Sequence, residues 1–198
     1  MRNLSIIAVI TALAFTSCQK LESIQPTSNV SAKKSDSKNS VSALKEKATS
    51  NFGAFTGEIC GEPVVTKLLA GKFIEVGTVT VFNDEFNVYV TYSLTASGWN
   101  FGTLHLYVGA LSGVPVNSSG NPIPGHFPFK AYVNGSTQSY TFTIPIDSLP
   151  ECYIVAAHAE VNGRSRETAW GQGPSFVSKG NWGTYFNDCK DLCELPPL

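Results

Sequence analysis

Apolar and polar residues alternate along several stretches of this 198-residue chain, and this alternation constrains the fold more than any other feature. The clearest stretch is 86–94, in which one face of an extended chain carries Phe86, Val88, Val90, Tyr92 and Leu94. A period of two residues is typical of a strand that is buried on one face only. Similar alternation predicts strands over 103–109, 139–146 and 153–161, and a run rich in β-branched residues predicts another over 73–82. Two shorter strands are expected near 167–171 and 182–187.

These predicted strands, with no stretch that predicts a long helix, indicate an all-β fold. The chain contains 17 glycines and 11 prolines, which suit many short strands joined by tight turns. Antiparallel strands with one polar face commonly pack as two facing sheets. We therefore predict an antiparallel β-sandwich over residues 53–198.

The first residues of the chain have the organisation of an export signal. Arg2 precedes an apolar run over 4–15, which is shorter than the roughly 20 residues that a membrane-spanning helix needs. The run leads into a Thr-Ser-Cys sequence that ends at Cys18, which resembles the lipobox of bacterial lipoproteins, with Phe15 where that family usually has leucine. The resemblance implies a cleaved signal peptide, residues 1–17, and several acyl chains on Cys18, enough for lasting membrane anchorage. An ordinary cleaved signal peptide is the alternative.

A polar segment over residues 18–52 separates the signal from the β-rich part. After Cys18 it contains eight serines and six lysines, and we predict a disordered tether because so little apolar surface cannot offset the entropy of ordering. Residues 19–52 have a net charge of +3, whereas residues 53–198 have a net charge of −5. The acidic balance of the folded part argues against nucleic-acid binding. Lysines beside a lipid anchor favour an anionic membrane surface.

The chain has five cysteines, an odd number that needs an explanation in an exported protein. If Cys18 carries lipid, then Cys60, Cys152, Cys189 and Cys193 remain and form two disulfides in an oxidising compartment. Our preferred pairing joins Cys60 to Cys189 or to Cys193, which ties the two ends of the domain together. Zinc is the rival interpretation, but no pair of cysteines has the two-residue spacing of most zinc sites.

A long stretch without alternation, residues 110–137, contains four prolines that exclude regular strand pairing over most of its length. Loops of this length are often functional. The candidate ligand contacts near its end are His126, Phe127, Phe129 and Tyr132. The alternative is that its aromatic side chains fold back and cover one end of the sandwich.

The sequence contains no recognised catalytic or phosphate-binding motif. His158 and Glu160 share one face of a predicted strand about 7 Å apart, and His105 lies on another strand. A metal or acid–base site is one interpretation of these three residues, and a hydrogen-bonded polar outer face is the other. We predict no catalytic residue, metal or cofactor, and we take the three as candidate ligand contacts together with Trp99, in a turn, and Tyr107, since aromatic rings stack on sugars. Tryptophans that fill the core are the alternative.

The string HLYVG…GNPIPGHFPFKA…YTFTIPI…LPECYIVAAHAEV…ETAWGQG…NWGTYF resembles a domain that recurs in secreted and surface proteins of Bacteroidota, over roughly residues 60–188. This resemblance implies an extracellular β-rich module and no named activity. The predicted function is therefore a lipoprotein of the bacterial cell envelope, at the outer membrane or cell surface, that binds a glycan, a polymer or a protein through its β-sandwich. A structural or assembly component of the envelope is one alternative, and a hydrolase that uses a His/Glu site is the other.

Overall fold

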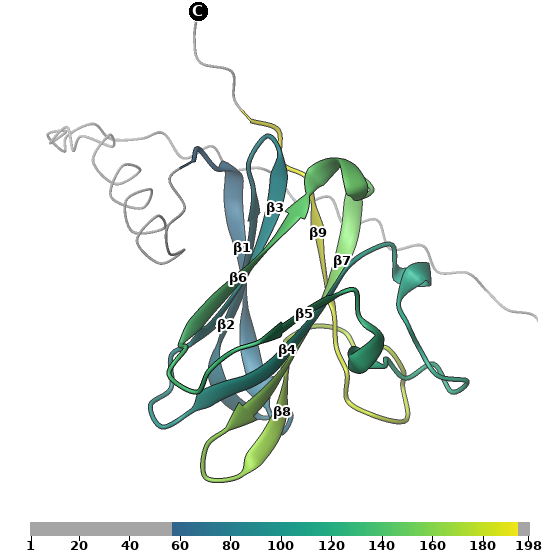
Figure 1. Cartoon of the computed structure of the whole chain (residues 1–198). Helices are drawn as coiled ribbons and strands as arrows, with labels where there is room; N and C mark the ends of the chain where they lie inside the picture. The colour runs from purple at the N-terminus through teal and green to yellow at the C-terminus, as the bar shows by residue number, and fades with distance from the viewer. Residues whose placement is uncertain (1–56, 194–198) are drawn as a thin grey trace, which may run out of the picture. The chain divides into compact units, whose positions relative to one another are not determined.

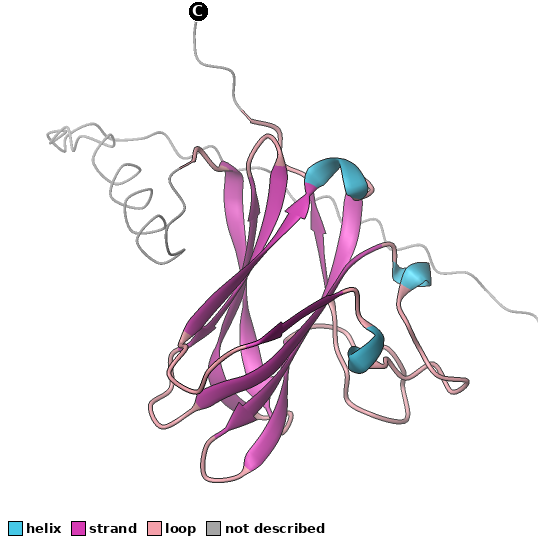
Figure 2. Ribbon diagram, in the orientation of Figure 1, coloured by secondary structure: helices cyan, strands magenta, loops and turns pink. Residues whose placement is uncertain are grey.

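The computed structural model describes residues 57–193, which form an all-β domain (Figures 1 and 2). The predicted signal peptide and tether lie outside these residues. Three single-turn 3-10 helices occur, η1 (Leu111–Gly113), η2 (Pro124–His126) and η3 (Ile146–Ser148). The strands are β1 (Cys60–Ala70), β2 (Ile74–Asn83), β3 (Asn87–Leu94), β4 (Asn100–Gly109), β5 (Phe129–Tyr132), β6 (Ser139–Pro145), β7 (Cys152–Asn162), β8 (Arg166–Gly171) and β9 (Phe186–Cys189). Within the described part of the chain, no helix has the length and apolar character that crossing a membrane requires.

All strand pairs are antiparallel, and the hydrogen-bonded order is β5-β4-β7-β8-β1-β2-β3-β6, with β9 paired to β7. One layer contains β5, β4 and β7, and the other contains β1, β2, β3 and β6 (Figure 1). Strand β8 pairs with both β7 and β1, so it joins the two layers along one side. On the other side the ring of Phe129 in β5 lies 6.4 Å from that of Phe142 in β6. The predicted antiparallel sandwich is therefore confirmed, and its two layers are parts of one bent sheet.

The two ends of the sandwich differ in what they carry. The turns β1–β2, β3–β4, β5–β6 and β7–β8 lie together at the end that we call the hairpin end (Figure 1). At the opposite end, disulfides join Cys60 to Cys193 and Cys152 to Cys189. We call this the disulfide end, and the described residues both begin and finish there. The predicted link from Cys60 to the C-terminal part of the chain is confirmed.

The main core lies between the two layers. It includes the apolar residues that the alternation placed on one face of β3, β4, β6 and β7, and Tyr92 is its largest fully buried side chain. The Tyr92 ring meets those of Phe101 and Phe142 edge to face, at 6.4 and 5.9 Å between centroids. Its hydroxyl donates to the backbone carbonyl of His105 at 2.9 Å, so the one polar atom of this ring is satisfied inside the core.

A second, smaller apolar cluster covers the outer face of β4, β7 and β8. Its members come from these strands and from the loops over 110–128 and 172–185, and they are Tyr107, Val114, Phe127, Ile154, Ala156 and Trp170, with Phe176, Trp182 and Tyr185 packed against them. The long loop therefore folds back on the domain, as one of the two interpretations predicted, but it covers a sheet face. Strand β4 is consequently buried on both faces over its C-terminal half.

Strands β2, β3, β4, β6 and β7 lie close to the predicted ranges, and β8 and β9 overlap the two shorter ones, but β2 and β7 are buried along most of their length instead of alternating. The alternation missed β1, which contains Pro63 and two irregularities of register against β2. It also missed β5, a strand of four residues that begins directly after Pro128. Phe86, predicted to lie on the buried face of β3, precedes that strand and is 69% exposed.

Candidate functional site

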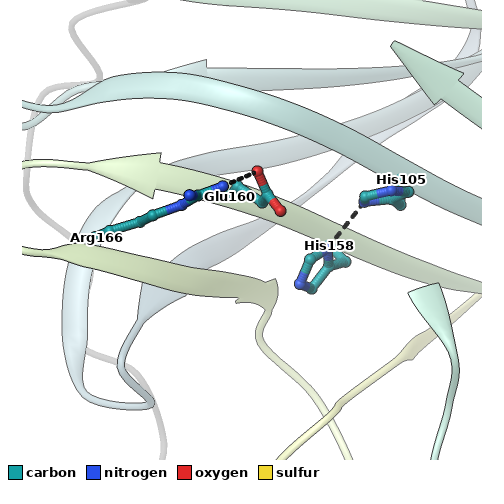
Figure 3. A network of polar contacts seen from close by, with 4 residues as sticks. All are labelled: His105, His158, Glu160 and Arg166. Carbon is teal, nitrogen blue, oxygen red and sulfur yellow. Dashed lines mark hydrogen bonds and ion pairs between the residues drawn. The ribbon is translucent and has the colours of Figure 1, made fainter. Parts of the chain in front are cut away.

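Two histidines meet on the outer face of the sheet. His105 in β4 and His158 in β7 are directly opposite each other in the register of these strands. Their Nδ1 atoms lie 3.2 Å apart, so one imidazole donates its N–H to the other (Figure 3). The residues are only 8% and 6% exposed. Since no other hydrogen bond reaches either ring among the described residues, this contact fixes the orientation of both.

Burial keeps the two histidines neutral. It lowers the pKa of His158 to about 3, and the neighbouring His105 contributes in the same direction. The pKa of His105 is also lowered, first by burial and then by the charge of Lys130. The Nδ1–Nδ1 hydrogen bond requires at least one neutral ring, because a doubly protonated pair has no acceptor, and the lowered pKa values meet this requirement.

The third predicted residue, Glu160, follows His158 on the same face of β7 and is bonded elsewhere. Its carboxylate accepts a hydrogen bond from the Arg166 guanidinium in β8 at 2.9 Å (Figure 3). Partial burial acts to raise the pKa of Glu160, but the hydrogen bond and charge of Arg166 hold it below its ordinary value. No hydrogen bond joins this carboxylate to either histidine in the described structure. The base-to-orienter contact that a His/Glu hydrolase uses is therefore not formed here.

The strand register extends the histidine pair into a row across four strands. Lys130 of β5 is opposite His105, and Trp170 of β8 is opposite His158. The Trp170 ring packs edge to face on the His158 ring, with 4.9 Å between centroids. On the side of this row toward the disulfide end, the second cluster covers the outer face of the sheet. On the other side, the lower part of the outer face toward the hairpin end is polar. We call that lower part, with Lys130, Tyr132, Thr103, Glu160 and Arg166, the polar outer face.

The remaining predicted ligand contacts are distributed over three places. Tyr107 and Phe127 lie in the second cluster, where the Tyr107 hydroxyl donates to the carbonyl of Ala110 at 2.6 Å. Phe129 points inward against the main core. His126 is exposed in η2 and lies outside the strand pairing.

Tyr132 and Trp99 lie nearer the hairpin end. Tyr132 is 80% exposed and is opposite Thr103 in the register, on the polar outer face. Trp99 is half-buried and packs against the main core. Of the other tryptophans, Trp170 is buried and Trp182 is half-buried in the second cluster. Tyr132 therefore provides an exposed aromatic side chain on the polar outer face.

Sequence reasoning did not place Lys130, Arg166 and Trp170 at the site. Arg166 and Trp170 both lie on β8, which follows β7 in the chain, and Lys130 lies on the unpredicted β5. The alternation could have shown that Lys130 and Tyr132 share a face. Their position beside His105 depends on pairing between β4 and β5, and the long loop that separates these strands in the sequence gives no indication of that pairing.

Known proteins give no further guide to the site. No protein-family model matches the chain, and no curated protein and no solved structure is detectably similar to it. Among residues 57–193, no three or more His, Cys, Asp or Glu residues are grouped so that they could hold a metal ion.

Proposed function

We propose that this protein is an exported bacterial lipoprotein, anchored by lipid on Cys18, whose β-sandwich is a binding module. The observation that carries the proposal is the pairing of the cysteines. The two disulfides use Cys60, Cys152, Cys189 and Cys193, so the fifth cysteine, Cys18, is left as the one expected to carry lipid. Disulfides persist in oxidising compartments outside the cytoplasm, which supports export.

The direction in which the chain enters the domain supports presentation of the polar outer face. The described residues begin next to Cys60 at the disulfide end, and the predicted tether precedes them in the sequence. The hairpin end lies at the opposite end of strands that are up to 11 residues long. A ligand approaching from outside the cell would then meet the hairpin end and the adjoining polar outer face.

The polar outer face has the composition of a glycan-binding surface. Tyr132 supplies an aromatic ring that is 80% exposed, and Lys130, Glu160 and Arg166 supply charged hydrogen-bonding groups nearby on the same face. An aromatic ring with adjacent polar groups can stack on the apolar face of a sugar and bond its hydroxyls. We therefore favour a glycan or related polymer as the ligand.

The anchor is tested by intact mass measurement of the membrane-bound protein, with and without reduction. The expected mass starts at Cys18, carries diacylglyceryl and acyl groups, and rises by four hydrogens on reduction. Replacement by Cys18→Ser should release the protein from the membrane fraction. A mature chain that begins elsewhere would overturn the anchor.

The binding face is tested separately with the full mature chain and a panel of cell-surface polysaccharides. Tyr132→Ala should abolish retention on the polysaccharide that wild-type protein binds. Phe86→Ala is the matched control, since Phe86 is 69% exposed and lies in the β2–β3 turn at the disulfide end. Equal loss in both variants, or none in Tyr132→Ala, would overturn the assignment of this face.

A further inference from the structure

The paired histidines have the geometry of two ligands to one metal ion. The Nδ1 atoms of His105 and His158 are 3.2 Å apart. Two metal–nitrogen bonds of about 2.0–2.1 Å would span this distance at an angle of about 100°, which is close to tetrahedral. We propose that His105 and His158 bind a divalent transition-metal ion, Zn²⁺ or Cu²⁺, at the upper edge of the polar outer face.

The protonation of the pair suits this role. Imidazole binds a metal through an unprotonated nitrogen, and burial already keeps both rings neutral. Before the ion binds, one Nδ1 carries the proton that it donates to the other. When the ion binds, this proton moves to Nε2 of the same ring, so both Nδ1 atoms become ligands. The exchange releases no net proton.

The surroundings of the pair allow the proton to be transferred through solvent to Nε2, and they include one negative charge close to the metal ion. No buried side-chain nitrogen of the described residues lacks a hydrogen-bond partner, and no hydrogen bond reaches either Nε2. Both Nε2 atoms therefore contact solvent. Glu160, two residues beyond His158, contributes a negative charge that favours a cation, whereas Lys130 and Arg166 oppose it.

The site supplies two protein ligands, because no third His, Cys, Asp or Glu of the described residues joins them. The remaining positions of the ion would be open to water or to a donor atom from outside. A hydroxyl or carboxylate group of a glycan bound to the polar outer face could then coordinate the ion. This role in glycan binding rests on the proposed function, whereas the metal site itself does not. Imidazole ligands suit Zn²⁺ and Cu²⁺ better than Ca²⁺ or Mg²⁺, which prefer oxygen.

The metal alone is the probe, added to full-length Cys18→Ser protein without a histidine tag, because a free thiol at residue 18 would bind the same ions. Calorimetry with Zn²⁺ should show one site. Cu²⁺ should quench the fluorescence of Trp170, whose ring is 4.9 Å from that of His158. Electron paramagnetic resonance of the Cu²⁺ form should show two imidazole nitrogens.

Variants decide whether the paired histidines are the ligands. His105→Gln and His158→Gln should each lower the affinity at least about tenfold, while far-UV circular dichroism shows an intact fold. His126→Gln, which removes the exposed third histidine, should leave the affinity unchanged. Trp170→Phe should remove the quenching and keep the calorimetric binding.

Three results would overturn the metal site: failure of the wild type to bind either ion, equal affinity in folded His105→Gln protein, or loss of affinity in His126→Gln. None of these results depends on glycan binding or on lipidation. The proposed function and the metal site can therefore fail independently.

Discussion

The side chain of Asn83 makes two hydrogen bonds to the backbone of Asp191: its nitrogen donates to the Asp191 carbonyl at 3.0 Å, and its oxygen accepts from the Asp191 N–H at 2.9 Å. Asn83 is the last residue of β2 and is only 2% exposed. The side-chain amide of Asn83 therefore pairs with the backbone N–H and carbonyl of a residue 108 positions away, as a neighbouring strand would, beside the Cys60–Cys193 disulfide.

Replacement of this amide should destabilise the domain. In Asn83→Ala the donor and the acceptor of Asp191 both lose their partner, and we expect the free energy of unfolding to fall by about 1–3 kcal/mol. Urea denaturation of the oxidised protein measures the change. Asn187→Ala is the control, because Asn187 is exposed and its side chain makes no hydrogen bond with the residues that the structure describes, and it should stay within about 0.5 kcal/mol of wild type. Equal effects in the two variants would contradict the role of Asn83.

The two disulfides should contribute unequally to stability. The bonded cysteines are 133 residues apart in Cys60–Cys193 and 37 apart in Cys152–Cys189. In the chain-entropy model, bonds that close loops of these lengths contribute about 5 and about 4 kcal/mol. Unfolding of the two double-serine variants should therefore show a loss that is about 1 kcal/mol greater without Cys60–Cys193. A greater loss without Cys152–Cys189 would show that the closed loop is not the deciding factor.

The sequence predicted which residues share a face, because alternation is a property of one strand at a time. Leu104 and Leu106 in the core and His105 on the other face follow from the pattern over 103–109. The alternation did not predict which residues cover the outer face of β4. Tyr107 is buried there by Phe127, which belongs to the proline-rich loop, and local alternation carries no information on that contact.

Pairing between distant strands explains the rest of the site. His105 and His158 are 53 residues apart, and their contact depends on β4 lying beside β7 in one exact register. A shift of one residue would turn one of the rings to the opposite face. Trp170 joins them only because β8 occupies the other edge of β7. These are relations between strands, so a single sequence could identify the residues as candidates without showing that they meet.

Acid should weaken the fold through the histidine pair. The pKa of His158 is about 3 in the folded protein, against an ordinary value of 6.5. The unfolded chain therefore binds a proton between about pH 6.5 and pH 3 that the folded chain does not, and stability falls as the pH falls through this window. The slope for one such proton is at most about 1.4 kcal/mol per pH unit. His158→Gln should flatten the slope.

The comparison between variants isolates this effect. Burial raises the pKa of Asp188, which acts in the opposite direction because the folded state then takes up a proton before the unfolded chain does. The readout is therefore the difference in slope between wild type and His158→Gln, from denaturation at a series of pH values. An unchanged slope in His158→Gln would show that this histidine does not titrate as inferred.

Gly163 in the β7–β8 turn provides space for Trp99, and a methyl group there should cost stability. A Cβ on Gly163 would lie 2.7 Å from the Trp99 ring, which packs against the core and cannot withdraw freely. We expect Gly163→Ala to lower the free energy of unfolding by about 1–3 kcal/mol. Gly135→Ala is the control, because a Cβ there meets nothing within 4 Å. In a Trp99→Ala background the cost of Gly163→Ala should disappear, and a cost that persists would assign it to the turn itself.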